Sequence, residues 1–304
     1  NDLRGSQSPR HMYLRACEAA GVPPEALIVR RHHSPQLMLG HFGLGDKRAE
    51  ALAAVLAHMP RVERLDLQDN RLTAKSLKAV LQALSARTDV VALDLSHNKL
   101  GSDGVTALCK FMESNGGARL GELRLAQTDI RDGDVRALAT ALAHCRCLTS
   151  LDLSHNDLHA GTGEALGEAL SSGCALRSLN LTWNRLGDAG AMAIAGALVK
   201  NISPLRHIEL GWNGVGDGGA SAFGAALATN TTLRTLALNQ NLVNASGAVV
   251  LADGLLHNGF LEALDLSYNS IGNQGARMLL QQLVVPDEAL AKAETIRRDI
   301  ALRK

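Results

Sequence analysis

The chain has 304 residues, a formal net charge of +1 and 46% hydrophobic residues. This balance gives no general attraction to nucleic acid or to an anionic membrane surface, so neither is an expected partner. The sequence holds no run of 18 apolar residues, which excludes an ordinary membrane-spanning helix.

Cysteine usage indicates the compartment. The five cysteines are odd in number and show no framework spacing, which is typical of a reducing compartment. We therefore expect a cytoplasmic protein. Nothing at the start resembles a signal peptide, and the first residue is Asn1. We expect that the chain begins inside a longer protein or follows a removed segment.

The segment before residue 34 predicts a tail and a helical cap. Residues 1–10 are polar and without periodicity, whereas residues 11–20 have the composition of one short helix, which Gly21-Val-Pro-Pro ends. The open end of a stack of repeats needs cover. We therefore assign residues 1–33 to an N-terminal tail and cap.

From residue 34 to residue 283 one pattern occurs nine times, at intervals of 28 to 30 residues. Counted from its first position, positions 4 and 6 are Leu in every repeat except for Ile208. Position 9 is Asn in seven of nine repeats, and Phe42 and Thr128 are the exceptions. The nine repeats begin at Ser34, Val62, Val90, Leu120, Leu148, Leu176, Leu205, Leu233 and Leu261.

Each repeat predicts a strand followed by a helix. Side chains alternate along a strand, so positions 4 and 6 point inward and positions 3, 5 and 7 point outward. The Asn at position 9 turns the chain and can satisfy backbone groups. Small residues then follow at helical spacing, such as Ala189, Ala193 and Ala197. One repeat cannot bury its apolar face alone, so stacked repeats share a core, with parallel strands on one face and helices on the other.

The run L-x-x-L-x-L-x-x-N-x-L-G-x-x-G-A-x-x-L-A-x-A-L is complete or nearly so at Leu176–Leu198 and Leu261–Leu280. Over residues 34–283 this pattern resembles the ribonuclease-inhibitor class of leucine-rich-repeat proteins. The resemblance implies an α/β solenoid, a horseshoe of about nine 28-residue repeats with parallel strands on the concave face and helices on the convex face. It also implies a non-catalytic interaction scaffold, without a cofactor, that binds a protein partner through the concave face and adjoining loops.

Both ends of the chain add expectations. A further resemblance, to the start of poorly characterised intracellular and ciliary members of the class, implies a subunit of a larger assembly such as a ciliary axoneme. After the last repeat, residues 284–304 predict a charged C-terminal helix, with acidic residues near its start and basic residues near its end. The residues that carry the upstream resemblance are Tyr13, Ala16, Cys17, Gly21, Val22 and Pro24.

Two alternative functions remain open. The class includes the Ran GTPase-activating protein, which implies a regulator of a small GTPase. The functional Arg of those relatives falls on Lys78, with Arg71 nearby, and Lys lacks the planar two-pronged donor group of Arg. The class also includes the sensor end of NOD-like receptors, which implies a ligand-sensing domain of a larger receptor.

Motifs typical of enzymes have simpler explanations in this chain. Gly214–Gly219 matches the dinucleotide pattern G-x-G-x-x-G, but the same slot in other repeats carries similarly spaced glycines. No phosphate-binding loop, nucleophile elbow, zinc-protease motif or catalytic triad is visible in the sequence. We predict a protein that is not an enzyme.

Histidines and cysteines do not predict a metal site. His41, His97 and His155 share position 8 in alternate repeats, about 10 Å apart, which is too far for one metal ion. A second group of histidine and cysteine residues lies at helix-to-strand turns, where the packing of small residues explains them without a metal ion. The group is His144, Cys145, Cys147 and Cys174.

The outward-facing positions predict where a partner binds. Position 5 is acidic in five of the nine repeats. Like charges on neighbouring strands repel, so either Arg124 offsets this acidic column internally or the column attracts a basic segment of the partner. The acidic residues are Asp66, Asp94, Asp152, Glu209 and Asp265.

Position 8 carries the two Trp of the chain. Trp183 and Trp212 occupy this position in adjacent repeats, and Tyr268 occupies it in the last repeat. Neighbouring exposed aromatic rings are typical of interaction hot spots, so we predict that these residues bind the partner. The alternative is that the rings fill local space beside the turn.

Overall fold

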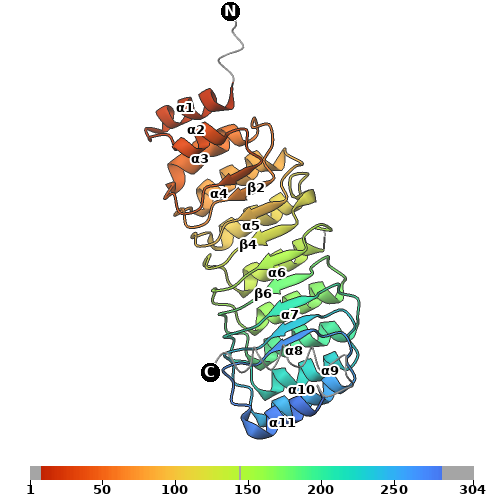
Figure 1. The fold of residues 1–304 in the computed structure, drawn as a ribbon. Coiled ribbons are helices and arrows are strands. Elements are labelled where there is room, and N and C mark those ends of the chain that lie inside the picture. The colour runs from red at the N-terminus through yellow and green to blue at the C-terminus, as the bar shows by residue number, and fades with distance from the viewer. Residues whose placement is uncertain (1–7, 144, 283–304) are drawn as a thin grey trace, which may run out of the picture. The chain divides into compact units, whose positions relative to one another are not determined.

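The computed structural model describes residues 8–143 and 145–282. Two compact units make up the chain. Unit one holds the described residues up to Ile130 together with Thr140–Asp152, and unit two holds Arg131–Ala139 and the described residues from Leu153 onward. Within each unit, Figure 1 shows the strands in one layer and the helices in another.

Unit one contains five short strands that pair in parallel and in chain order. The position-4 leucines lie opposite one another, as in the pairing of Leu93 with Leu123 and of Leu123 with Leu151. The strands are β1 (Gln36–Met38), β2 (Arg64–Asp66), β3 (Ala92–Asp94), β4 (Glu122–Arg124) and β5 (Ser150–Asp152). The helices are α1 (Pro9–Ala20), α2 (Ala26–Arg31), α3 (Gly45–Leu56), α4 (Ala74–Ser85), α5 (Gly101–Met112) and the short 3₁₀ helix η2 (Gly117–Arg119).

Unit two repeats the same arrangement. Four strands pair in parallel and in chain order, with Leu179, Ile208 and Leu236 in register. They are β6 (Ser178–Asn180), β7 (His207–Glu209), β8 (Thr235–Ala237) and β9 (Ala263–Asp265). The helices are α7 (Ala160–Ser171), α8 (Gly187–Val199), α9 (Asp217–Leu227), α10 (Ala245–Leu256) and α11 (Gly272–Gln282), while α6 (Asp132–Leu142) shares its residues between the units.

The core of each unit consists of the inward positions that the repeat pattern predicts. Leu93 and Leu95 in unit one, and Leu179 and Leu181 in unit two, are fully buried. The predicted strand followed by a helix in each repeat, and the inward direction of positions 4 and 6, are thus confirmed. Burial of each such leucine contributes about 1.5–3 kcal/mol before conformational entropy is subtracted.

Small residues let neighbouring helices approach closely in unit two. A Cβ added to Gly163 on α7 would lie only 2.4 Å from the Gly190 Cα on α8. A Cβ added to Gly254 on α10 would lie 2.0 Å from the carbonyl oxygen of Gly224 on α9. Both distances are far below van der Waals contact, so these helices can pack at this spacing only because glycine stands there.

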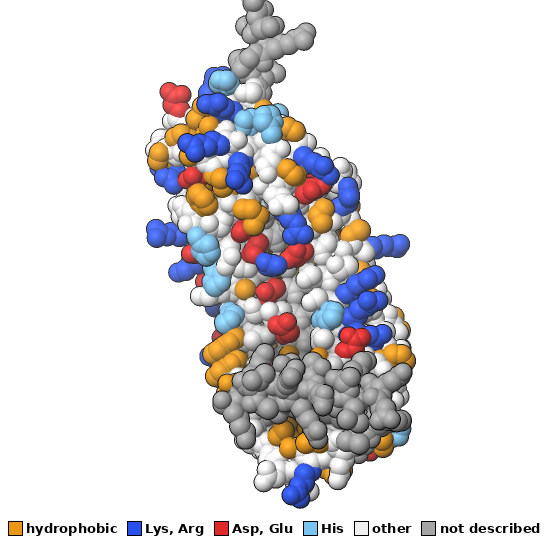
Figure 2. Space-filling view, viewed as in Figure 1, with side chains coloured by type: hydrophobic (Ala, Val, Ile, Leu, Met, Phe, Trp, Pro, Cys, Tyr) orange, Lys and Arg blue, Asp and Glu red, His pale blue; other side chains and the backbone are white. Residues whose placement is uncertain are grey.

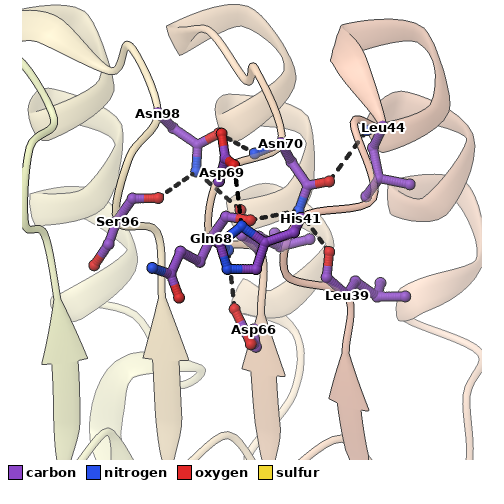
Figure 3. A network of polar contacts seen from close by, with 10 residues as sticks. Leu39, His41, Leu44, Asp66, Gln68, Asp69, Asn70, Ser96 and Asn98 are labelled. Carbon is purple, nitrogen blue, oxygen red and sulfur yellow. Dashed lines mark hydrogen bonds and ion pairs between the residues drawn. The ribbon is translucent and has the colours of Figure 1, made fainter.

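The position-9 asparagines join each repeat to the one before it. The Asn98 side-chain oxygen accepts the backbone N–H groups of Asn70 and Leu72, at 3.1 and 2.9 Å. The Asn98 side-chain nitrogen donates to the carbonyl oxygens of Leu67 and Leu95, at 2.9 Å each. Figure 3 shows Asn70 and Asn98 bridging neighbouring turns in this way. The predicted role of the asparagine is confirmed, because it satisfies buried backbone groups that the strand pairing does not reach.

Thr128 replaces asparagine in the fourth repeat and has a hydroxyl in place of the side-chain amide. Its hydroxyl donates to the Leu125 carbonyl at 2.8 Å. The Leu100 N–H donates to the Thr128 carbonyl at 3.3 Å, whereas the Leu72 N–H donates to the Asn98 side-chain oxygen. For this N–H group, a backbone carbonyl therefore takes the place of the asparagine side-chain oxygen.

The N-terminal helices lie against the first repeat. Helix α1 begins at Pro9, two residues before the predicted start, and Ser8 caps it by accepting the His11 N–H at 3.4 Å. The buried Tyr13 hydroxyl accepts the Glu25 N–H at 3.1 Å, which ties α1 to the start of α2. Helix α1 contacts α3. The charged helix expected at residues 284–304 lies outside the described residues.

None of the helices in the described ranges combines the length and the apolar character that crossing a membrane requires.

Candidate functional site

Position 8 of every repeat has a left-handed backbone. All nine residues have φ between 49° and 65°. This conformation suits glycine and is tolerated by asparagine and aspartate, but costs about 1–2 kcal/mol for other L-residues. The nine residues are His41, Asp69, His97, Gln127, His155, Trp183, Trp212, Gln240 and Tyr268.

Trp183 and Trp212 stack on each other at this strained position in unit two. Their ring centroids lie 4.1 Å apart with 14° between the planes, and His155 stacks on Trp183 at 5.5 Å and 15°. The two tryptophans keep 46% and 41% of their surface exposed. Neighbouring aromatic rings that stay this exposed are typical of interaction hot spots. We call His155, Trp183 and Trp212 the aromatic stack.

Tyr268 shares the left-handed backbone but not the stack. It is exposed, and Gln240 occupies position 8 between it and Trp212. Within the described part of the chain, Tyr268 makes no ring contact. It lies on the same edge of the sheet as the stack, two repeats away.

In unit one the acidic position-5 residues have backbone partners. The Asp66 carboxylate accepts the Gln68 N–H, and the Asp94 carboxylate accepts the Ser96 N–H, each at 2.9 Å. Asp and Asn side chains in turns commonly accept the backbone N–H of the residue two positions later in the chain. Burial, with a smaller contribution from Asp94, raises the pKa of Asp66 above its usual value. The acidic column thus has a structural explanation that the sequence pattern alone does not provide.

Arginines offset the same column. Arg124 lies 3.6 Å from the Asp94 carboxylate and 2.5 Å from that of Glu122, and Arg64 lies 3.2 Å from Glu122. Figure 2 shows acidic and basic side chains next to one another over these strands. Asp152 lies opposite Arg124 in the strand register. The pairing of Arg124 agrees with the internal-offset interpretation.

In unit two the acidic column is sparse. Asp265 accepts the Ser267 N–H at 2.9 Å, and Asn180 accepts the Thr182 N–H at the same distance, so both serve the turn. Glu209 is exposed on β7 between them in the register. The aromatic stack is therefore the more distinctive surface feature of this unit.

A shallow hollow lies on the strands of unit one. Its volume is about 80 Å³, well below the roughly 300–1,000 Å³ of a typical small-molecule pocket. A flat surface with a small hollow suits a macromolecular partner better than a small-molecule substrate. The lining residues are Met38, Arg64, Leu65, Asp66, Ala92, Leu93, Asp94, Glu122 and Arg124.

Sequence comparison agrees with this architecture. The family described as Leucine Rich repeat matches residues 88–109, 144–167, 174–195, 201–224, 229–252 and 257–280. Mouse (Mus musculus) ribonuclease inhibitor is 33% identical over 149 residues, which is 48% of this chain and 32% of that protein. The chain is a ribonuclease-inhibitor-like leucine-rich-repeat protein.

Other leucine-rich-repeat relatives are larger. The Tonsoku-like protein of Danio rerio is 26% identical over 46% of this chain and 10% of its own length. Human (Homo sapiens) NACHT, LRR and PYD domains-containing protein 13 is 32% identical over 47% of this chain and 14% of its own length. The chain therefore spans about a third or less of these curated relatives.

The glycine-rich loop is already occupied by a side chain of the protein. The Asp188 carboxylate accepts the N–H groups of Gly216 and Gly219, at 2.7 and 2.9 Å. These are N–H groups that a bound dinucleotide phosphate would need. The G-x-G-x-x-G match is thus explained by contacts between neighbouring repeats.

The histidine and cysteine groups also have local partners. His41 pairs with Asp69 at 3.0 Å, and the Cys145 thiol donates to the Met112 carbonyl at 3.3 Å. Burial raises the pKa of Cys145 to about 11, so its thiol stays protonated at neutral pH. Among the described residues no group of three or more His, Cys, Asp or Glu side chains could hold a metal ion. His144 lies outside the described residues.

One surface feature was missed in the sequence. Arg177, Arg206 and Arg234 occupy position 2 of three consecutive repeats in unit two, at the starts of β6, β7 and β8. The signal was available as a repeated residue type in one column. Position 2 lies just outside the predicted strand, so the outward-facing strand positions do not include it.

Proposed function

We propose that this chain is a non-catalytic scaffold that binds a protein partner over the Trp183–Trp212 pair. Leucine-rich-repeat proteins are generally protein-interaction scaffolds, and ribonuclease-inhibitor-like members are typically non-catalytic. The observation that carries the proposal is that two large rings stack, half exposed, on left-handed backbone. Small polar residues fit that backbone better, and half-exposed neighbouring tryptophans are typical of interaction hot spots.

A partner would recover the cost of placing these rings at the surface. Tryptophan is enriched among the few interface residues that carry most of the binding energy. The stacked pair is already held in one orientation, so little side-chain freedom remains to be lost on binding. Covering the remaining exposed ring area adds a hydrophobic contribution of about 25 cal/mol per Å².

The acidic column of unit one supports a partner that carries a basic segment. Asp66, Asp94 and Asp152 outnumber Arg124 at position 5 of this unit. Complementary charge of this kind speeds association and fixes the orientation of a partner more than it adds affinity. We therefore place a basic segment of the partner over β2–β5.

The cellular setting is part of the proposal. All five cysteines are free thiols, which supports a reducing compartment such as the cytoplasm. The resemblance of residues 13–24 to ciliary members supports a place in a larger assembly such as an axoneme. No geometry in the described part of the chain singles out a small-GTPase regulator, since Lys78 and Arg71 are simply exposed.

The test removes the two rings and measures capture of the native partner. Trp183→Ala combined with Trp212→Ala should weaken partner binding by more than about 2 kcal/mol, or roughly 30-fold. The matched control is Met192→Ala combined with Val250→Ala, because these side chains are 51% and 40% exposed on α8 and α10 of the same unit. Quantitative affinity enrichment from native extract, followed by titration of the recovered partner, compares the variants. Equal binding by both double variants would remove the aromatic pair from the proposal.

A further inference from the structure

We propose that unit two recognises an acidic, extended segment of its partner, which lies along the strands from Arg177 and Arg206 to the aromatic stack. This inference rests on the proposed function, because it specifies the partner of the same surface. It assigns to unit two the charge opposite to the one proposed for unit one.

Arg177 and Arg206 form an uncompensated basic pair. The Arg206 N–H donates to the Arg177 carbonyl at 2.8 Å, so the two residues are direct neighbours at the strand starts. Both are exposed, and neither forms a salt bridge within the described ranges. Like charges on neighbouring strands are destabilising, so this pair has an electrostatic cost that an anionic partner would remove.

Arg234, the next arginine at position 2, differs because its charge has partners within the protein. One Arg234 guanidinium nitrogen donates to the carbonyl oxygens of Thr231, Thr232 and Leu233, at 3.0 to 3.2 Å. The Arg234 guanidinium also lies 3.8 Å from Glu262 and over the Phe260 ring at 5.5 Å. The protein therefore satisfies Arg234 itself and leaves the first two arginines of the column for another molecule.

The aromatic stack favours the same kind of partner. His155 covers one face of Trp183 and Trp212 covers the other, so Trp183 offers only its edge to a partner. The edge of an aromatic ring is the positive part of its quadrupole, whereas a cation seeks the face. Neither indole N–H has a hydrogen-bond acceptor within the described ranges, so each can donate to a partner oxygen. The edge of Trp183 and the two indole N–H groups thus suit carbonyl and carboxylate oxygens.

The spacing of the two features sets the length of the segment. Backbone hydrogen bonds between neighbouring repeats extend from Arg206 to Trp212. The backbone N–H of Trp212 donates to the Asn239 carbonyl at 3.1 Å. Arg206 and Trp212 are six positions apart along the chain, with β7 (His207–Glu209) between them, so their backbones lie at most roughly 20 Å apart. An extended peptide of about six residues spans the same distance. Glu209 lies exposed between the ends, so the acidic residues of the segment belong at the arginine end and an uncharged or apolar portion at the stack.

The test is a selection that assumes no particular partner. A displayed library of random peptides of about twelve residues is selected on the wild-type chain and sequenced. We expect the selected pool to be enriched in Asp and Glu. A synthetic peptide from the pool should bind the Arg177→Gln, Arg206→Gln double variant about tenfold or more weakly than wild type. The matched control, Lys200→Gln with Arg277→Gln, removes the same charge from exposed positions of unit two and should leave binding unchanged. Glu209→Gln should strengthen binding.

The outcomes separate this inference from the proposed function. Selected peptides that need Trp183 and Trp212 but carry Lys and Arg, or that bind the Arg177/Arg206 variant equally well, would overturn the acidic segment and leave the scaffold proposal standing. Peptides that bind Trp183→Ala with Trp212→Ala as well as wild type, or a library that yields no binder, would overturn both.

Discussion

The guanidinium of Arg87 holds the carboxylate of Asp89 in a two-pronged pair. The Arg87 Nε donates to Asp89 Oδ1 at 2.8 Å, and Nη2 donates to Oδ2 at 2.6 Å. The remaining Arg87 nitrogen donates to the carbonyls of Leu56 and Met59, at 2.7 and 2.8 Å, where α3 ends. Asp89 in turn accepts the Val62 N–H at 2.7 Å. This pair, in which Arg87 is buried and Asp89 half-buried, joins consecutive repeats of unit one.

We predict that Arg87→Lys destabilises the protein strongly. Lysine cannot make the planar two-pronged contact with Asp89 and reach both helix-end carbonyls. Each buried polar group left unsatisfied costs about 1–3 kcal/mol, so we expect a loss of about 2 kcal/mol or more. Urea unfolding followed by circular dichroism measures the change, with Arg61→Lys as the control because Arg61 is exposed in the same unit. A loss below about 1 kcal/mol would show that the pair is not important for stability.

Asn98→Ala tests the bonds between repeats. The substitution leaves the N–H groups of Asn70 and Leu72 and the Leu67 carbonyl without their side-chain partner. Each buried polar group left unsatisfied costs about 1–3 kcal/mol, so we expect a total loss of about 3 kcal/mol or more. Asn98→Asp keeps the acceptor and loses the donors, and should fall between alanine and wild type. Equal stability of Asn98→Ala and wild type would contradict this role.

Asp46 should make the protein sensitive to acid. Its carboxylate accepts the Thr73 N–H and hydroxyl at 2.9 Å each and the Ser76 hydroxyl at 2.6 Å. Partial burial raises the pKa of Asp46, but these hydrogen bonds outweigh burial and hold the pKa below its usual 3.8. Because the folded pKa is the lower one, the stabilisation is present above the unfolded pKa of about 3.9 and is lost as pH falls through the folded pKa.

Asp46→Asn should therefore cost about 1 kcal/mol near pH 7 and flatten the loss of stability below about pH 4. Urea midpoints measured across this pH range give the slope. Asp103→Asn is the control, because Asp103 is exposed on α5 of the same unit. A variant whose acid profile overlays that of wild type would show that the hydrogen bonds of Asp46 do not contribute to stability.

The left-handed backbone at Trp183 predicts an unusual order of stabilities. Asparagine tolerates φ of 60°, whereas a β-branched residue does not, so Trp183→Asn should be more stable than Trp183→Val by about 1 kcal/mol or more. Relative to wild type, Trp183→Asn loses about 0.5–1.5 kcal/mol of stacking but relieves a similar backbone cost. Thermal unfolding of the two variants decides. A more stable valine variant would show that the backbone at this position relaxes without strain.

The fold followed from the sequence because its period is strict. Each repeat places Leu93, Leu95 or their equivalents at the same two positions, and alternation along a strand dictates their direction. The asparagine role was also predictable, since a turn after a short strand leaves buried backbone groups unpaired. These features are local or repeat at one interval, which is what a single sequence can reveal.

The contacts between side chains at irregular positions were not predictable. Arg87 and Asp89 occur in one repeat only, so the repeat pattern does not indicate that they pair. The left-handed backbone at position 8 also gave no signal, because His, Asp, Gln, Trp and Tyr all occupy it. Likewise, the bonds from Asp66 and Asp94 to the backbone depend on turn geometry, so the acidic column appeared free in the sequence and is partly committed in the structure.

Quenching of tryptophan fluorescence tests the central claim most directly, because Trp183 and Trp212 are the two Trp of the chain. Half-exposed rings in the free protein are accessible to acrylamide. The account predicts that saturation with the partner, or with a selected peptide that lacks Trp, lowers the acrylamide quenching constant severalfold and shifts the emission to shorter wavelength. An unchanged quenching constant at saturation would contradict it, because the bound molecule would then lie elsewhere on the protein.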